Sequence, residues 1–521
     1  MESKYQRLLH DSLLHSAANA KEKTVVVVEG TPYTYAALLD ASLRFASHVS
    51  ASGLQRGDRV AIYMDNTWPC VVSIFGTLLA GGVFMVVNPQ TKADKLKYIL
   101  NDSGARFLIT DGHLAKVFLP ILAETASIET VLCSGEIPAE AENLSEKLLP
   151  FEATLARTPP GAPNPAVIGI DLAALIYTSG STGNPKGVMM THQAMTFTAG
   201  SLIEYLRLVP DDRILNLLPV AFDYGLYQLL MTVRLGATLV LERSFTFPAQ
   251  IFNRMRSENV TVFSGVPTVY MTMLGVHARG KLSFPSVRRV TNTAAALPAD
   301  IVPQLKEIFP NALIFRMYGL TECKRVCYLE PELIGVKPDS VGKAIPGTEV
   351  FLLSEDGKPV PRGETGILYI RGPHVMLGYW NQPGLSAHML KPGRLPGERI
   401  LCSQDFFRMD EDGCLYFQGR SDDIIKTRGE KVSPIEVENC LHGIPGVREA
   451  AVLGVPDALL GESIRAFISL QDGIVLSEKE IKAACMARLE NFMVPKEVVF
   501  LPELPKTATG KIRKKDLAVS V

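Results

Sequence analysis

The chain has 521 residues, a formal net charge of -1 and a hydrophobic content of 47 %. This length exceeds what one hydrophobic core normally serves, so we expect at least two domains. The near-neutral charge excludes a broad basic surface for nucleic acid, and the composition is typical of a soluble globular protein. The eight cysteines are scattered along the chain, which favours reduced thiols and a cytoplasmic location.

Short apolar runs rich in β-branched residues recur along the first half of the chain, with helical stretches between them. Strands that are apolar throughout and alternate with helices are typical of parallel sheets covered on both faces. The sequence therefore predicts the α/β class. The runs are TVVVV from Thr24, RVAIY from Arg59, RFLIT from Arg106, TVLC from Thr130, AALIY from Ala173, ATLVLE from Ala237 and VTVFSG from Val260.

One uncharged run, Cys70–Val87, approaches the length of a membrane span. It contains Gly81 and Gly82 and stops at Asn88-Pro89, which predicts a buried helix, a break and a buried strand instead. The N-terminal segment lacks the layout of a signal peptide. We therefore expect no membrane partner.

The segment Tyr177–Gly187, YTSGSTGNPKG, comes directly after the apolar strand AALIY. Its glycines allow backbone N–H groups to converge on an anion, its hydroxyl side chains add donors, and Lys186 supplies a positive charge. Gly187 follows the lysine, so the spacing is not that of a Walker A loop. The pattern predicts a phosphate-binding loop rather than a flexible linker.

The segment Pro219–Met231, PVAFDYGLYQLLM, is apolar or aromatic almost throughout, yet Asp223 stands in its middle, directly after Phe222. A buried carboxylate costs several kcal/mol, roughly 3–5 if it is unpaired. Two interpretations follow. Asp223 is either the N-cap of the helix that follows it, or it faces a cation that a ligand brings.

From about Thr348 onward the sequence pattern changes from alternating strands and helices to hairpins. Asp356-Gly357 and Asp412-Gly413 each separate two apolar runs, which is typical of β-hairpins. We expect a small antiparallel or barrel-like subdomain over residues 345–418. After Arg420 the sequence predicts helix, strand, strand and helix, hence a compact α+β domain. We therefore expect an N-terminal core over residues 1–420 and a C-terminal domain over residues 421–521.

Four motifs in this order resemble the adenylate-forming superfamily, which includes acyl-CoA synthetases, stand-alone adenylation enzymes and luciferases. Besides the loop at Tyr177, they are MYGLTE (Met317–Glu322), the segment Ser403–Glu438 and PKTATGKIRKKDL (Pro505–Leu517). The resemblance covers essentially the whole chain. It implies a large N-terminal domain of helix-flanked parallel sheets with a small β-barrel subdomain, and a mobile C-terminal domain. It also implies a reaction in which ATP and a carboxylate form an acyl-adenylate and pyrophosphate, after which a thiol takes the acyl group.

The resemblance assigns a role to each motif. Glu322 would hold Mg²⁺, Tyr318 would flank the adenine, and Asp405 would bind the ribose hydroxyls, although Gln404 stands where the family usually has glycine. ATP binding is assigned to Thr178, Ser179, Gly180, Ser181, Thr182, Gly183, Tyr318, Gly319, Asp405 and Arg420. The catalytic residues are expected to be Lys186, Thr321, Glu322 and Lys511, with Thr321 donating to the α-phosphate and Lys511 contacting both the carboxylate and the α-phosphate.

Further assignments concern the second half-reaction and the substrate. Asp422 falls at the hinge about which the family's C-terminal domain rotates, and Gly429 would leave room for a phosphopantetheine arm. The substrate-binding residues are expected to be Phe222, Asp223, Ala295 and Gly319.

Members of the superfamily that activate amino acids carry Phe-Asp at this point, and the aspartate pairs with the substrate ammonium. Together with YGLTECKRVCYL and GRSDDIIKTRGEKV, the Phe222-Asp223 pair most resembles free-standing prolyl-carrier-protein ligases. This resemblance implies activation of an amino acid, foremost L-proline, and its transfer to the phosphopantetheine thiol of a separate carrier protein.

Three alternatives stay open. The first is an acyl-CoA ligase that acts on a non-amino acid and transfers the acyl group to coenzyme A. The second is a catalytically inactive scaffold, against which the intact Lys186, Glu322, Asp405, Arg420 and Lys511 argue. The third is a luciferase-like oxygenase, for which no motif speaks.

Overall fold

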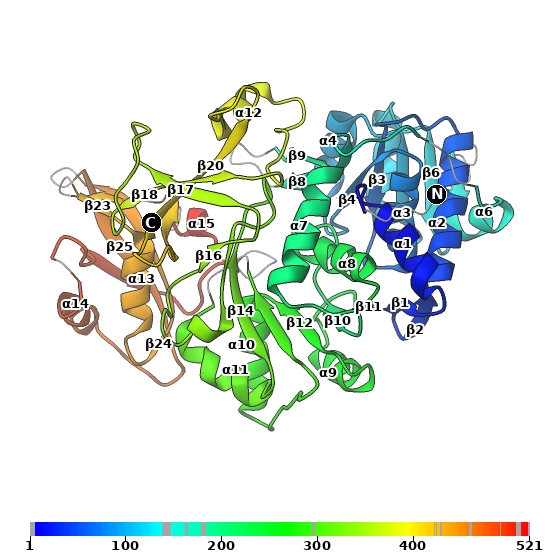
Figure 1. Ribbon diagram of the computed structural model, residues 1–521. Helices are drawn as coiled ribbons and strands as arrows, with labels where there is room; N and C mark the ends of the chain where they lie inside the picture. The colour runs from blue at the N-terminus through cyan, green and yellow to red at the C-terminus, as the bar shows by residue number, and fades with distance from the viewer. Residues whose placement is uncertain are drawn as a thin grey trace.

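The computed structural model describes residues 6–137, 147–161, 165–178, 184–293, 297–420, 423, 425–427, 430–457, 461–489, 491–506 and 512–518. These residues form four β-sheets with helices packed around them (Figure 1). Two large sheets, mostly parallel, occupy the N-terminal part, an antiparallel sheet follows, and the C-terminal part has a small sheet of its own.

The first large sheet has seven strands in the order β7-β6-β5-β3-β4-β8-β9. Its pairs are parallel except for β8 with β9, which are antiparallel. The strands are β3 (Arg59–Tyr63), β4 (Val83–Val87), β5 (Phe107–Asp111), β6 (Thr130–Ser134), β7 (Leu148–Pro150), β8 (Leu172–Thr178) and β9 (Lys186–Thr191). The helices of this stretch are α2 (Tyr35–Ala51), α3 (Trp68–Leu79), α4 (Ala93–Ser103), α5 (Ala115–Phe118) and α6 (Phe151–Arg157).

The second large sheet has nine strands in the order β16-β15-β14-β13-β12-β10-β11-β1-β2. The pairs from β14 to β1 are parallel, and the edge strands β2, β15 and β16 run antiparallel. The strands are β1 (Thr24–Val28), β2 (Thr31–Thr34), β10 (Arg213–Asn216), β11 (Thr238–Leu241), β12 (Val262–Gly265), β13 (Arg289–Asn292), β14 (Leu313–Tyr318), β15 (Cys327–Leu329) and β16 (Lys343–Ala344).

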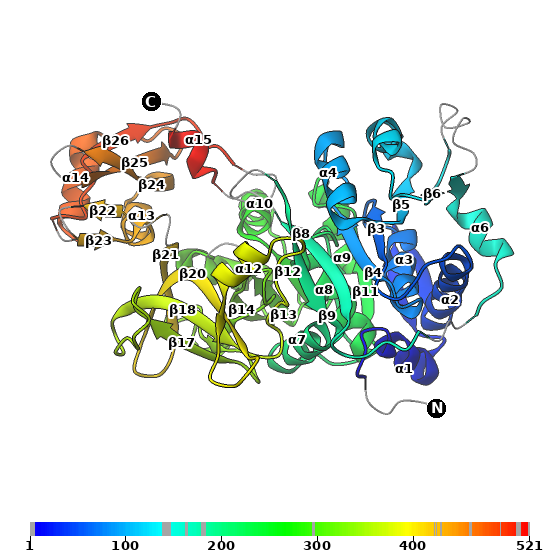
Figure 2. The ribbon, with the colours of Figure 1, turned by 90° about the horizontal axis from the view of Figure 1, so that it is seen from above.

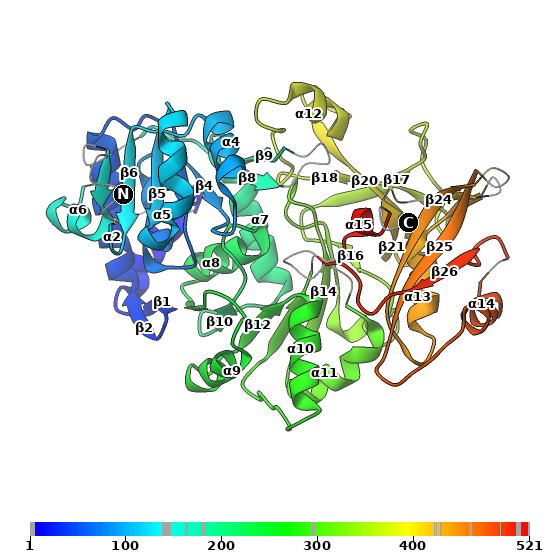
Figure 3. The ribbon, with the colours of Figure 1, turned by 180° about the vertical axis from the view of Figure 1, so that it is seen from behind.

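The helices of the second sheet complete the core. They are α1 (Asp11–Ala20), α7 (His192–Tyr205), α8 (Asp223–Leu235), α9 (Pro248–Ser257), α10 (Pro267–His277) and α11 (Val302–Ile308). Figures 1 and 3 show α7 and α8 where the two sheets meet. One continuous cluster of buried side chains draws on both sheets and on these helices. The predicted α/β class, with helix-flanked parallel sheets, is confirmed.

The uncharged run Cys70–Val87 folds as expected. It supplies most of the buried helix α3, a turn in which Gly81 has φ 77°, and the buried strand β4. The run is therefore part of the core, because its helix and its strand pack into the clusters beneath the first sheet. Within the described ranges, no helix combines the length and the apolar character that crossing a membrane requires.

The third sheet is antiparallel and has five strands, β17 (Glu349–Leu353), β18 (Thr365–Arg371), β19 (Leu390–Pro392), β20 (Arg399–Met409) and β21 (Leu415–Arg420), with helix α12 (Pro383–Met389) before β19. Both Asp-Gly pairs lie in turns, and Gly357 and Gly413 have φ 79° and 80°. The hairpins are confirmed. The expected antiparallel subdomain is therefore confirmed, and its described strand pairs run from β17 through β18 to β20, with β19 and β21 along the other side of β20.

The C-terminal part contains the predicted helix, strand, strand and helix as its middle elements, and adds two strands before them and a strand and a helix after them. It contains β22 (Ile425–Thr427), β23 (Glu430–Val432), α13 (Pro434–His442), β24 (Val447–Asp457), β25 (Gly461–Leu470), α14 (Glu478–Met486), β26 (Glu497–Phe500) and α15 (Lys514–Ala518). Its buried side chains form clusters of their own. Figure 2 shows this part beside the third sheet, and the Ser433 hydroxyl at the start of α13 donates to the carbonyl of Gln418 in β21.

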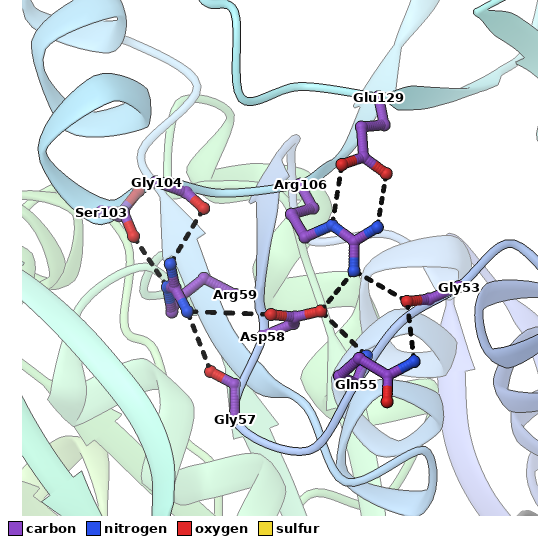
Figure 4. Close-up of polar contacts among 9 residues, drawn as sticks. All are labelled: Gly53, Gln55, Gly57, Asp58, Arg59, Ser103, Gly104, Arg106 and Glu129. Carbon is purple, nitrogen blue, oxygen red and sulfur yellow. Dashed lines mark hydrogen bonds and ion pairs between the residues drawn. The ribbon is translucent and has the colours of Figure 1, made fainter.

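A network of charges ties the amino ends of three parallel strands together (Figure 4). Arg106, just before β5, donates two hydrogen bonds to the Glu129 carboxylate, of 2.9 and 2.6 Å, and one of 2.6 Å to Asp58. Arg59, the first residue of β3, donates to the carbonyl of Ser103 over 2.7 Å. Since ligands of parallel sheets bind at the carboxyl ends of the strands, this network holds the sheet together at the edge away from a ligand.

Candidate active site

The predicted phosphate-binding loop is the tip of a β-hairpin. The carboxyl end of β8 lies against the amino end of β9, so that Thr178 and Lys186 are direct partners across the antiparallel pair. The Thr178 hydroxyl is buried and has no hydrogen-bond partner among the described residues. The tip itself, Ser179–Gly183, lies outside the described residues, so the anion-binding role of Ser179, Gly180, Ser181, Thr182 and Gly183 stays a prediction.

Lys186, the first residue of β9, contacts Glu322. The Lys186 ammonium lies 3.3 Å from Glu322 Oε1 and donates a 2.8 Å hydrogen bond to the Tyr379 hydroxyl. Tyr379 in turn donates to the same Glu322 oxygen over 2.6 Å, and its ring centroid is 4.3 Å from the ammonium. Burial, and then the Glu322 charge, raises the Tyr379 pKa far above its usual value, so the phenol stays a donor. The three side chains therefore hold one another in place.

The motifs did not identify Tyr379. Its segment runs along β9, where the Met189 N–H donates to the Gly378 carbonyl over 3.0 Å and the Trp380 N–H donates to the Gly187 carbonyl over 2.8 Å. No spacing in the sequence links residue 379 to Lys186, because the two segments meet only through this tertiary pairing. The hint in the sequence is the aromatic pair that Tyr379 forms with its neighbour Trp380.

Glu322 suits a magnesium ion. Among the described residues both of its side-chain contacts use Oε1, so Oε2 remains for a ligand. A carboxylate oxygen is the donor that Mg²⁺ prefers, and Mg²⁺ in nucleotide sites is commonly held by one or two carboxylates together with the substrate phosphates. Thr321, just before it, lies in a partly exposed turn.

The residues predicted for adenosine come together from two sheets. Tyr318, at the end of β14, donates a hydrogen bond to Asp405 Oδ2, and Asp405 lies opposite Arg420 in the pair of β20 with β21. The Arg420 Nε atom is 3.6 Å from Asp405 Oδ1. The rings of Phe407 and Phe417 lie 4.9 and 6.0 Å from that of Tyr318, measured between centroids. The arrangement places an aromatic face beside a buried carboxylate, as binding of a nucleoside requires.

Gln404, which stands where the family usually has glycine, adopts a backbone conformation that glycine favours. Its φ is 62°, in the left-handed region that favours glycine. Glycine adopts this conformation without strain. Gln404 adopts it too, and its Nε2 lies 3.1 Å from the Cys402 sulfur. The substitution leaves the position of Asp405 intact.

Asp223 is not an N-cap. Helix α8 begins at Asp223 itself, Phe222 precedes it as the cap residue, and no side-chain capping hydrogen bond is formed. Instead, Asp223 Oδ2 lies 3.6 Å from the ammonium of Lys324, whose side chain is 2 % exposed, whereas that of Asp223 is 23 % exposed. The chain therefore supplies a cation of its own to Asp223.

Lys324 sits in a crowded, mostly aromatic environment. Its ammonium is 5.3 and 5.0 Å from the ring centroids of Tyr224 and Tyr227. Burial lowers the Lys324 pKa, the Asp223 charge raises it and the charge of Arg325 lowers it, with a result of about 7. The backbone of Lys324 has φ 64°, in the left-handed region, and the loop turns tightly there. Its carbonyl oxygen would lie 2.3 Å from a Cβ at position 319, so only glycine fits at Gly319.

Arg325 is the second buried cation of this loop. It is 1 % exposed, one guanidinium nitrogen donates to the Thr293 hydroxyl, and the guanidinium carbon is 5.7 Å from the ring centroid of Tyr224. Its Nε is buried and has no hydrogen-bond partner among the described residues. The sequence pattern of this loop contributed to the family resemblance but gave neither Lys324 nor Arg325 a role. The available hint was two adjacent cations in the otherwise apolar stretch after Glu322.

Four further assignments lie outside the described residues. They are the catalytic Lys511, the hinge Asp422, the thiol-channel Gly429 and the substrate-binding Ala295. All four stay predictions.

Comparison with known proteins bears on the whole chain. The family model for the AMP-binding enzyme matches residues 13–380, and that for the AMP-binding enzyme C-terminal domain matches residues 436–511. The long-chain-fatty-acid–CoA ligase of Bacillus subtilis (strain 168) is 30 % identical over 539 residues, which cover 98 % of this chain and 94 % of the relative. The feruloyl-CoA synthase of Amycolatopsis sp is 34 % identical over 496 residues, which cover 94 % of each.

Among solved structures, ATP-bound MatB from Rhodopseudomonas palustris superposes with a TM-score of 0.88 at 27 % identity, covering 98 % of both chains. The match extends over the N-terminal sheets and the C-terminal part together. With its Lys186–Glu322 pair and its Asp405–Arg420 pair in place, the chain belongs to the family of AMP-binding enzymes, ATP-dependent ligases that form acyl-adenylates and transfer the acyl group to a thiol.

Proposed function

We propose that this chain is an AMP-forming acyl-CoA ligase that activates a non-amino carboxylic acid with ATP and transfers the acyl group to coenzyme A. One observation carries this choice over the amino-acid reading: the Asp223 carboxylate already faces the Lys324 ammonium. A substrate ammonium at the same carboxylate would meet Lys324 and, beside it, Arg325. Like charges in a poorly solvated site repel strongly, so a positively charged substrate is disfavoured.

The names of the relatives support the same choice. The two relatives described above are named as CoA ligases or synthases, and so is a 3-hydroxybenzoate–CoA ligase of Aromatoleum sp.. The prolyl-carrier-protein reading rested on the Phe222-Asp223 pair. Lys324 removes the need for a substrate cation, and with it the main reason for that reading.

The first half-reaction joins two anions, so the site must supply positive charge. We assign Lys186 to the phosphates, held in position by Tyr379 and Glu322. A magnesium ion bound at Glu322 would neutralise charge on the phosphate oxygens. Tyr318, Asp405 and Arg420 would hold the adenosine, so that the α-phosphate meets the substrate carboxylate in line.

The second half-reaction needs the C-terminal residues. We propose that residues 421–521 turn as a unit about Asp422, which would withdraw Lys511 and bring Gly429 to the pantetheine arm of coenzyme A. The buried clusters that lie within these residues alone support a unit that moves without losing its own core.

The experiment is a pyrophosphate-exchange panel followed by an acceptor assay. Purified enzyme with ATP and Mg²⁺ is given octanoate, benzoate, ferulate, L-proline and other amino acids, and each active acid is then offered coenzyme A or a phosphopantetheinylated carrier protein. We expect exchange with non-amino acids and thioester only with coenzyme A. Exchange confined to L-proline, with transfer only to the carrier protein, would overturn the proposal and restore the prolyl-ligase reading.

A further inference from the structure

The loop after Glu322 buries more positive charge than the described residues neutralise. Lys324 and Arg325 are adjacent, and both are at most 2 % exposed. Among the described residues, the carboxylate in ion-pair contact with them is Asp223, which faces Lys324, whereas Arg325 has no ion pair. A buried guanidinium without an anion is costly, and its Nε also has no acceptor within the part of the chain that the structure describes.

This charge lies where segments of the expected acyl pocket meet. Thr293, which accepts from Arg325, follows β13, and Tyr224, which faces both cations, belongs to the first turn of α8. The same loop carries Glu322, whose carboxylate contacts Lys186 beside the phosphate-binding loop. The cations are therefore a few residues from the reaction centre and at the wall expected to face the acyl group.

We propose that Arg325 is a specificity-determining residue that binds a second carboxylate of the substrate, so that the acid activated by this enzyme is a dicarboxylic acid. This inference rests on the proposed function. One substrate carboxylate reacts at the α-phosphate, and the other accepts from the Nε–H of Arg325, for which the described residues offer no acceptor. Lys324 and Asp223 form a neutral pair beside it, so one net positive charge remains for one anionic group.

The test uses matched acids that differ only in the second carboxylate. Pyrophosphate exchange is measured with butyrate and succinate, hexanoate and adipate, and benzoate and each phthalate isomer. The wild-type enzyme should show a kcat/KM for at least one dicarboxylate that exceeds that of its monocarboxylate partner by roughly 10- to 100-fold, the range of one charge-assisted hydrogen bond in a buried site. In Arg325→Met this ratio should fall by about the same factor.

A matched control removes another buried arginine. Arg316 in β14 is also buried, and its Nε and one terminal nitrogen likewise have no hydrogen-bond partner among the described residues, but the charge of Asp339 opposes its own, so Arg316→Met should leave the dicarboxylate-to-monocarboxylate ratio unchanged. If Arg325→Met fails to fold, Arg325→Lys tests the same point, since it keeps the charge and loses the fixed guanidinium geometry, and the wild-type ratio decides in any case.

The outcomes separate this inference from the function on which it rests. Monocarboxylates activated as well as their dicarboxylate partners, with coenzyme A thioesters formed, would overturn the inference and leave the acyl-CoA ligase intact. Exchange with none of the acids, and with L-proline instead, would overturn the proposed function and this inference with it.

Discussion

The ion pair between Asp223 and Lys324 makes the strongest quantitative prediction. Asp223→Asn keeps the size of the side chain and removes the charge that raises the pKa of the buried Lys324, so the ammonium must either stay without a carboxylate in ion-pair contact among the described residues or release its proton. Removing one partner of a buried pair costs about 3–5 kcal/mol. Asp223 is 23 % exposed and its oxygen lies 3.6 Å from the ammonium, so we expect a smaller loss of unfolding free energy, about 2–3 kcal/mol.

A double-mutant cycle isolates the interaction. Lys324→Met leaves Asp223 partly solvated and should cost less than Asp223→Asn, and the double variant should lie within about 1 kcal/mol of the wild type, because it leaves no new unpaired charge in the core. The expected coupling between the two sites is then about 2 kcal/mol.

The assay is urea unfolding followed by tryptophan fluorescence. Both tryptophans, Trp68 and Trp380, lie outside residues 421–521, so the signal reports on the N-terminal part that contains the ion pair. An Asp223→Asn variant as stable as the wild type, additive with Lys324→Met and defective only in activating amino acids, would refute the reasoning. Asp223 would then have met its cation in the substrate.

Three further predictions follow from the site and the core. Tyr379→Phe removes a hydrogen bond to the Glu322 carboxylate worth about 1.5–3 kcal/mol, so adenylate formation in a pyrophosphate-exchange assay should fall roughly 10- to 100-fold; unchanged exchange would show that Tyr379 does not position Glu322. Lys511→Ala should reduce adenylate formation by orders of magnitude and largely spare thioester formation from preformed adenylate, and equal loss in both steps would remove its assignment to adenylation. Burial lowers the His192 pKa to about 3, so the folded protein keeps this ring neutral and loses stability as pH falls below 6.5, by about 1.4 kcal/mol at pH 5.5. His192→Asn retains an acceptor for the Leu9 N–H and should remove that part of the acid sensitivity in urea unfolding; an unchanged pH slope would contradict the assignment.

Much of the fold follows from local pattern. The apolar runs became the strands of the two large sheets, and Asp356-Gly357 and Asp412-Gly413 became hairpin turns, because strand burial and turn geometry depend on neighbours in the chain. The order of the strands within the antiparallel sheet did not follow, since β18 pairs with β20 and not with β19, the next strand along the chain.

The candidate site shows the same difference between what a local pattern specifies and what only the fold specifies. The sequence by itself was enough to predict which residues take part, including Lys186, Glu322 and Asp405, because their motifs are contiguous and each residue type suits a phosphate, a metal ion or a ribose. Only the tertiary structure decided what each side chain faces. The cation of Asp223 is Lys324, on a loop about a hundred residues away, and no local pattern specifies a contact made by two segments that meet only in the folded core.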